Sequence, residues 1–142
     1  MEIKPYLRKV QFYETDAMGI VHHANYVRWM EECRVHFMDE IGYSYAKCSV
    51  EGGIDIALTD IKCEYKGMVR FGDTVRMEMD IIHISLAKLR VRYRMYDAAT
   101  GQLRFEGESG HFFYNNRKGQ VTGLKRVLPE LYELLCSLCV KE

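Results

Sequence analysis

The sequence predicts an α+β fold in which one long helix accompanies an antiparallel sheet. Apolar residues recur at helical spacing once in the first third of the chain and alternate with polar residues from residue 54 to about residue 114. They return to helical spacing only near the C-terminus. The 142 residues are enough for one core and too few for two independent ones, and no linker or internal repeat divides them. We therefore expect a single domain over residues 1–142.

The N-terminal part of the chain predicts a strand, a turn and the long helix. Residues 6–13 supply the strand, and the turn around Asp16 follows. An apolar stripe then predicts a helix from about Asn25 to Ile41, with Gly42 as its C-terminal stop. The stripe consists of Tyr26, Met30, Cys33, Phe37 and Ile41. Because further apolar residues lie off this stripe, we expect the sheet to wrap around the helix.

The alternation of the next strand changes phase in its middle. Ile54, Ile56 and Leu58 occupy even-numbered positions, whereas the apolar residues of this strand from Ile61 onward occupy odd-numbered ones. A period of two residues changes phase only through an extra residue, which predicts a bulge or bend at Thr59–Asp60. Bulges re-aim side chains beside binding sites, so Thr59 is a candidate substrate contact.

Three more strands and a short helix complete the expected fold. Residues 75–81, 89–95 and 103–114 alternate, and the connections at 71–73, 85–87 and 97–101 are short enough for hairpins in a meander. Pro129 begins an amphipathic helix. This helix contains the pair Cys136 and Cys139, which we interpret as structural because no second cysteine pair accompanies it.

Composition excludes several partner classes. Lys plus Arg and Asp plus Glu each number 20, so the net charge is zero and gives no electrostatic support for a nucleic-acid partner. No apolar stretch approaches the roughly 18 residues that span a bilayer, and no charged leader precedes an apolar run. Five scattered cysteines fit reduced thiols better than a disulfide framework. We expect a soluble cytoplasmic protein without a membrane partner.

Charged residues alternate with the apolar ones on the predicted strands. Opposite charges on neighbouring strands can pair across the ladder, which accounts for most of them. Phosphate binding is the alternative for Lys88 and Arg90, because they follow the turn at Ser85, where a long anionic ligand could reach them.

The segment from Thr15 to Tyr26 holds the residues best suited to chemistry. Asp16 lies in a glycine turn with Gly19, and His22 and His23 lie at the predicted start of the helix. Unpaired N–H groups and the positive end of the helix dipole favour developing negative charge there. A carboxylate at such a place suits attack on a carbonyl. The alternative is that Asp16 only holds the turn and that the histidines are cap or core groups.

The chain resembles the hotdog-fold acyl-CoA thioesterases, specifically the branch similar to 4-hydroxybenzoyl-CoA thioesterase. The resemblance covers essentially the whole chain and rests on an aspartate signature followed by two downstream matches. These residues are Phe12, Glu14–Asp16, Gly19–Val21, His23–Tyr26, Glu64–Tyr65 and Phe71–Asp73. His22 departs from the aromatic residue that many relatives have there, which leaves open whether one or both imidazoles face the substrate.

The resemblance implies a sheet wrapped around the helix, and a homodimer or homotetramer that binds acyl-CoA between subunits. By this likeness Asp16 is either the nucleophile or the general base for water, and the His23 backbone N–H polarises the thioester carbonyl while its imidazole orients the reactants. Gly19, Val21, His22 and Tyr26 would contact the substrate. Neither a metal nor a cofactor is required. An acyl-carrier protein could replace CoA as the donor, and the acyl group stays open.

Three other interpretations remain. Some hotdog enzymes place their carboxylate on the central helix, where this chain has Glu31 and Glu32, although nearby Arg28 and Arg34 favour solvent-facing or ion-paired roles. A hydroxyacyl dehydratase and a non-catalytic acyl-CoA-binding module share the same scaffold. Retention of Asp16 within its motif favours hydrolysis over both.

Overall fold

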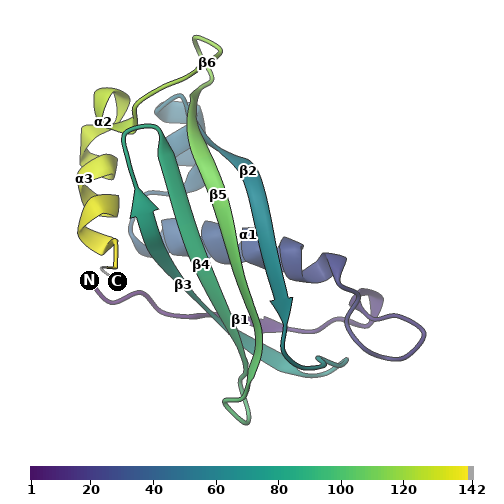
Figure 1. Ribbon diagram of the computed structural model, residues 1–142. Helices are drawn as coiled ribbons and strands as arrows, with labels where there is room; N and C mark the ends of the chain where they lie inside the picture. Colours follow the sequence, from purple (N-terminus) through teal and green to yellow (C-terminus); the bar gives the residue numbers. More distant parts are fainter. Residues whose placement is uncertain (141–142) are drawn as a thin grey trace.

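The structure, a computed structural model, describes residues 1–140 and is α+β, as predicted. One antiparallel sheet has the strand order β1-β3-β4-β5-β2, and a short β6 pairs with β5 (Figure 1). The elements are β1 (Tyr6–Lys9), the 3-10 helix η1 (Phe12–Glu14), α1 (Ala24–Glu40), the π-helix η2 (Lys47–Glu51), β2 (Ile54–Tyr65), β3 (Thr74–Ile84), β4 (Lys88–Asp97), β5 (Leu103–Asn115), β6 (Gln120–Val121), α2 (Leu124–Val127) and α3 (Pro129–Leu138).

Helix α1 begins and ends one residue before the predicted positions. Gly42, at a φ of 78°, provides the left-handed residue after the helix, as expected. Trp29 and Met30 are fully buried against the sheet, and Gly107 of β5 leaves room for the Met30 side chain. The opposite side of the helix is exposed at Arg28, Glu31, Val35 and Asp39. Within one chain the sheet therefore covers α1 on one side only (Figure 1).

Strand β2 contains the predicted bulge, because its pairing register with β5 shifts between Leu58 and Asp60. The expected hairpin at 71–73 is wrong. β2 pairs with β5 and lies at an edge of the sheet, so only β3, β4 and β5 form a meander. Segment 66–73 instead leads from β2 to β3, and β4 and β5 lie between these two strands in the sheet. On its way the Val69 carbonyl accepts a hydrogen bond from the Val21 N–H at 2.8 Å, which ties the crossing to the segment that precedes α1.

The first strand is shorter than predicted. It covers Tyr6–Lys9 rather than residues 6–13, and a 3-10 turn follows at Phe12–Glu14. The turn forms because the Glu14 side chain accepts a hydrogen bond from the Gln11 N–H, which removes that donor from any strand ladder.

The outer face of the sheet carries the expected cross-strand ion pairs. Arg92 contacts Asp80 at 3.1 Å and Arg90 contacts Glu108 at 2.8 Å. Cys136 lies in α3, as predicted, and Cys139 follows the last residue of that helix. Within residues 1–140, no helix is both long and apolar enough to cross a membrane.

Candidate active site

Asp16 lies in an exposed turn whose backbone is closed by hydrogen bonds at both ends. The Asp16 N–H donates to the Ile20 carbonyl at 2.9 Å, and the Gly19 N–H donates to the Asp16 carbonyl at 3.0 Å. Gly19 has a φ of 74°, which a side chain would oppose. The Met18 N–H donates to Oδ1 of Asp16 at 2.8 Å, an Asx turn that orients the carboxylate. Among residues 1–140, Oδ2 accepts no hydrogen bond.

The two histidines differ in their surroundings at the N-terminus of α1. Nδ1 of His22 accepts a hydrogen bond from the Ala24 N–H at 3.2 Å, so this ring caps the first turn of the helix. The His23 N–H has no acceptor within the described part of the chain. It is therefore a free donor at the positive end of a 17-residue helix.

A hollow of about 380 Å³ lies beside this helix end. Its lining includes His23, Val21 and Tyr26, together with Ile20, Tyr65 and residues 66–69. Tyr26 is at once a core residue and part of this wall: its ring stacks on Phe105 with centroids 5.0 Å apart, and burial raises its pKa to about 12. His22 and the carboxylate-bearing Asp16 are not part of the lining. Of the two histidines, only His23 contributes to the lining, and the two imidazole rings lie against each other with centroids 4.2 Å apart.

The remaining predicted contacts form a separate group. Thr59, Lys88 and Arg90 line another hollow, of about 290 Å³. Ser85 lies in the hairpin between β3 and β4, at the opposite end of the sheet from the turn that precedes α1 (Figure 1). Arg90 is held between Asp60 and Glu108 at 2.8 Å each, whereas Lys88 is exposed and, among the described residues, has no ion pair. A single chain does not bring this group to Asp16.

The rival carboxylates on α1 are arranged as the structural interpretation predicts. Glu31 is exposed, and Glu32 binds Arg8 at 2.9 Å and accepts a hydrogen bond from the Tyr6 hydroxyl at 2.7 Å. Within residues 1–140, no group of three or more His, Cys, Asp and Glu side chains is placed to hold a metal ion.

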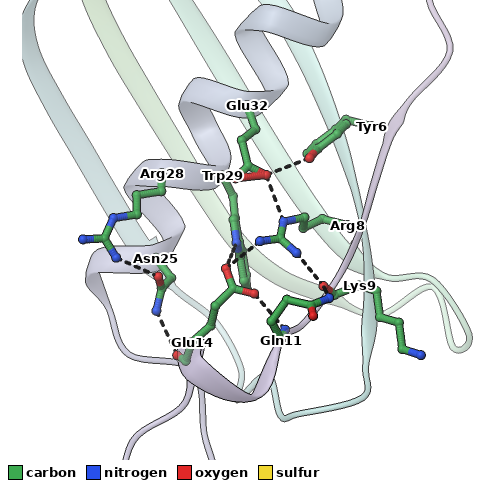
Figure 2. Close-up of polar contacts among 9 residues, drawn as sticks. All are labelled: Tyr6, Arg8, Lys9, Gln11, Glu14, Asn25, Arg28, Trp29 and Glu32. Atoms are coloured by element: carbon green, nitrogen blue, oxygen red, sulfur yellow. Dashed lines mark hydrogen bonds and ion pairs between the residues drawn. The ribbon is translucent and has the colours of Figure 1, made fainter.

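Sequence reasoning missed the role of Glu14, the residue two positions before Asp16. It is only 3% exposed, and its carboxylate binds the Trp29 indole N–H at 2.7 Å and Arg8 at 2.9 Å (Figure 2). The signal available in the sequence was a tryptophan on the buried side of α1, because a buried indole N–H needs an acceptor.

A buried chain of hydrogen bonds was also missed. Arg34 donates to the Tyr93 hydroxyl at 2.9 Å, which contacts Ser109 Oγ at 2.7 Å, and Ser109 contacts Nε2 of His111 at 2.7 Å. Because Arg34 can only donate, each hydroxyl must donate onward and Nε2 of His111 must accept. Within residues 1–140, Nε of Arg34 and Nδ1 of His111 are buried without a hydrogen-bond partner. Burial, assisted by the positive charge of Arg34, lowers the pKa of His111 to about 4. His111 is therefore neutral near pH 7.

Comparison with known proteins identifies the family. The model of the thioesterase-like superfamily matches residues 10–133. This chain belongs to that superfamily. A Bacillus subtilis (strain 168) protein, YneP, provisionally named an acyl-CoA thioesterase, is 29% identical over 122 residues, which are 86% of this chain and 87% of YneP. An Aquifex aeolicus (strain VF5) protein provisionally named an esterase is 41% identical over 80 residues, 56% of this chain and 62% of its own length.

The fold comparison agrees with the family. The crystal structure of a DHNA-CoA thioesterase from Staphylococcus aureus superposes with a TM-score of 0.88 at 23% identity, covering 94% of this chain and 89% of that chain. This likeness establishes the fold: the curled antiparallel sheet packed on a long helix is the hotdog arrangement that the sequence predicts.

Proposed function

We propose that this member of the thioesterase-like superfamily hydrolyses an acyl-CoA thioester to the free acid and CoA, using Asp16 and the His23 N–H. The observation that carries the proposal is that one short segment, residues 16–23, holds an oriented carboxylate and, at the start of α1, a free N–H donor. A thiolate is a good leaving group, so the reaction mainly needs a positioned nucleophile and a donor to the carbonyl oxygen.

Two routes use the Asp16 carboxylate. As general base, its free oxygen takes a proton from water while the water oxygen bonds to the thioester carbon. As nucleophile, the same oxygen bonds to that carbon and water later cleaves the mixed anhydride. In both routes the C–S bond breaks, the thiolate leaves with the electron pair, and a proton restores the thiol. The Met18 N–H holds Oδ1 and leaves Oδ2 for either role.

The His23 N–H is the proposed donor to the oxyanion. Negative charge develops on the carbonyl oxygen as the carbon becomes tetrahedral, and a fixed N–H at a helix N-terminus stabilises that charge without reorganising. The acyl group would then lie toward the hollow lined by Val21 and Tyr26. The imidazole of His23, a residue that also lines this hollow, would orient the acyl group, the water or Asp16.

We further propose that the active unit is a homodimer or homotetramer. Within residues 1–140, β2 pairs with β5 on one side, and its other edge is unpaired over a strand of 12 residues. Such an edge is a template for pairing with a second chain. Two copies related by a two-fold axis would pair β2 antiparallel, which places the Tyr65 end of one strand beside the Ile54 end of the other. The Asp16 turn of one chain would thereby approach the group around Thr59 in its partner.

Lys88 and Arg90, which line the same hollow as Thr59, are the proposed contacts to the phosphates of CoA. Lys88 is the stronger candidate because its ammonium is exposed, whereas two carboxylates already neutralise Arg90. An acyl-carrier protein, whose acyl group is attached through the same type of thioester, is the alternative donor.

Hydrolysis of a panel of acyl-CoA esters tests this proposal. Thiol release would be followed with aromatic, short-chain and medium-chain acyl-CoA, and with matching acyl-carrier-protein thioesters. The proposal predicts catalytic release from at least one class of acyl-CoA. A folded, oligomeric protein that binds acyl-CoA and releases no thiol from any ester would be a binding module and would contradict hydrolysis.

A further inference from the structure

The buried carboxylate of Glu14 faces hydrogen-bond donors at both of its oxygens (Figure 2). Oε1 accepts from the Gln11 backbone N–H at 2.8 Å, and Oε2 accepts from the Trp29 indole N–H at 2.7 Å and from Arg8 at 2.9 Å. A buried carboxylate is costly unless it is paired and fully hydrogen-bonded. These three donors meet that requirement and come from the residue that precedes the 3-10 turn, from α1 and from β1.

The backbone carbonyl of Glu14 also connects the two sides of the Asp16 loop. It accepts hydrogen bonds from the His22 N–H at 2.9 Å and from Nδ2 of Asn25 at 2.8 Å. Glu14 precedes Asp16 by two residues, and His22 precedes the proposed oxyanion donor by one. One residue therefore joins the base of the Asp16 loop to the N-terminus of α1 through both its side chain and its backbone.

We propose that Glu14 is a positioning residue that fixes the Asp16 carboxylate relative to the His23 N–H. This inference rests on the proposed function, because it assigns those two groups to the reaction. The two groups belong to different elements, and their separation depends on how the loop is tied to the helix. A misplacement of about 1 Å is enough to cost roughly 100-fold in rate.

The chain offers a matched control in Glu32, the other carboxylate bound to Arg8. Glu32 uses one oxygen, Oε1, for both Tyr6 and Arg8. A glutamine there keeps that acceptor. Glu14 uses both oxygens, so in Glu14→Gln the new NH₂ group must face either the Gln11 N–H or the Trp29 and Arg8 donors. The same chemical change is thus disruptive at Glu14 and mild at Glu32.

Steady-state kinetics of the full-length variants provide the first test. With an acyl-CoA that the wild type hydrolyses, Glu14→Gln should lower kcat by about 10- to 100-fold with KM within about twofold, whereas Glu32→Gln should retain both. Trp29→Phe removes the indole donor and should lower kcat by a smaller factor with KM unchanged. It therefore replaces Glu14→Gln if that variant does not fold. Wild-type kcat in a folded Glu14→Gln protein, or in Trp29→Phe when only that variant folds, would overturn the proposal.

Amide hydrogen exchange gives a second readout that does not depend on activity. The Asp16 N–H and the His22 N–H should lose protection in Glu14→Gln and keep it in Glu32→Gln, under conditions where both variants stay folded. If the wild type proves inactive on all thioesters, this loss would still support the tie between loop and helix, and only the proposed function would fail. Equal protection of both amides in the two variants would overturn the positioning role.

Discussion

Acidification should destabilise the native state through His111. Its pKa falls from 6.5 to about 4 on folding because the ring is buried, with 2% of its surface exposed. Between these pH values the unfolded chain binds a proton that the native state does not, so the free energy of unfolding decreases as the pH falls and this loss levels off below about pH 4. A difference of about 2.5 pH units corresponds to about 3 kcal/mol.

Urea unfolding at fixed protein concentration measures this effect. The single tryptophan, Trp29, is fully buried and reports the transition by fluorescence. His111→Gln keeps an acceptor for Ser109 and should lose much less stability between pH 6.5 and pH 4 than the wild type does. The control variant His83→Gln, at an exposed position of β3, should lose as much stability as the wild type over the same range. All three proteins contain the same carboxylates, so the difference between them reports on the His111 imidazole together with its small effect on the pKa of Asp60. Identical pH dependence in wild type and His111→Gln would refute the reasoning.

Three further predictions concern ligand, turn and assembly. Replacing Lys88 and Arg90 together by Ala should raise KM for acyl-CoA more than it lowers kcat; an equally severe effect on a pantetheine thioester, which lacks the nucleotide, would contradict phosphate binding. Gly42→Ala should lower the free energy of unfolding by about 1 kcal/mol in urea titrations, because φ is 78° there; unchanged stability would argue against strain. Sedimentation should show at least a dimer at micromolar concentration, and a stable 16.7 kDa monomer would count against a site between subunits.

Periodicity predicted those parts of the fold in which one face of an element is buried. The stripe from Tyr26 to Ile41 locates α1 to within one residue at each end, and the phase change before Ile61 locates the bulge of β2. Strand partners are different, because alternation shows which face is buried and not which strand lies alongside. This is why a hairpin between β2 and β3 was expected where β2 in fact pairs with β5.

Buried polar groups were the harder part of the site. Ser109 and His111 occupy odd-numbered positions of β5, as the buried Phe105 and Phe113 do. The alternation itself therefore places both polar side chains on the inner face. Their hydrogen bonds to Tyr93 and Arg34 depend on tertiary packing and leave no local pattern. Glu14 was recognised only as part of a motif, because its partners Arg8 and Trp29 come together only when β1 and α1 pack.

The central claim, that Asp16 is the reacting carboxylate, is tested most directly by the kcat of Asp16→Asn. This change keeps the size of the side chain and removes both a nucleophile and a base, so kcat should fall by about 100-fold or more while acyl-CoA still binds. Glu31→Gln should cost little, and His23→Ala should lie between the two because its backbone N–H remains. Near-normal hydrolysis by folded, oligomeric Asp16→Asn, or loss of activity in Glu31→Gln alone, would contradict the proposed mechanism.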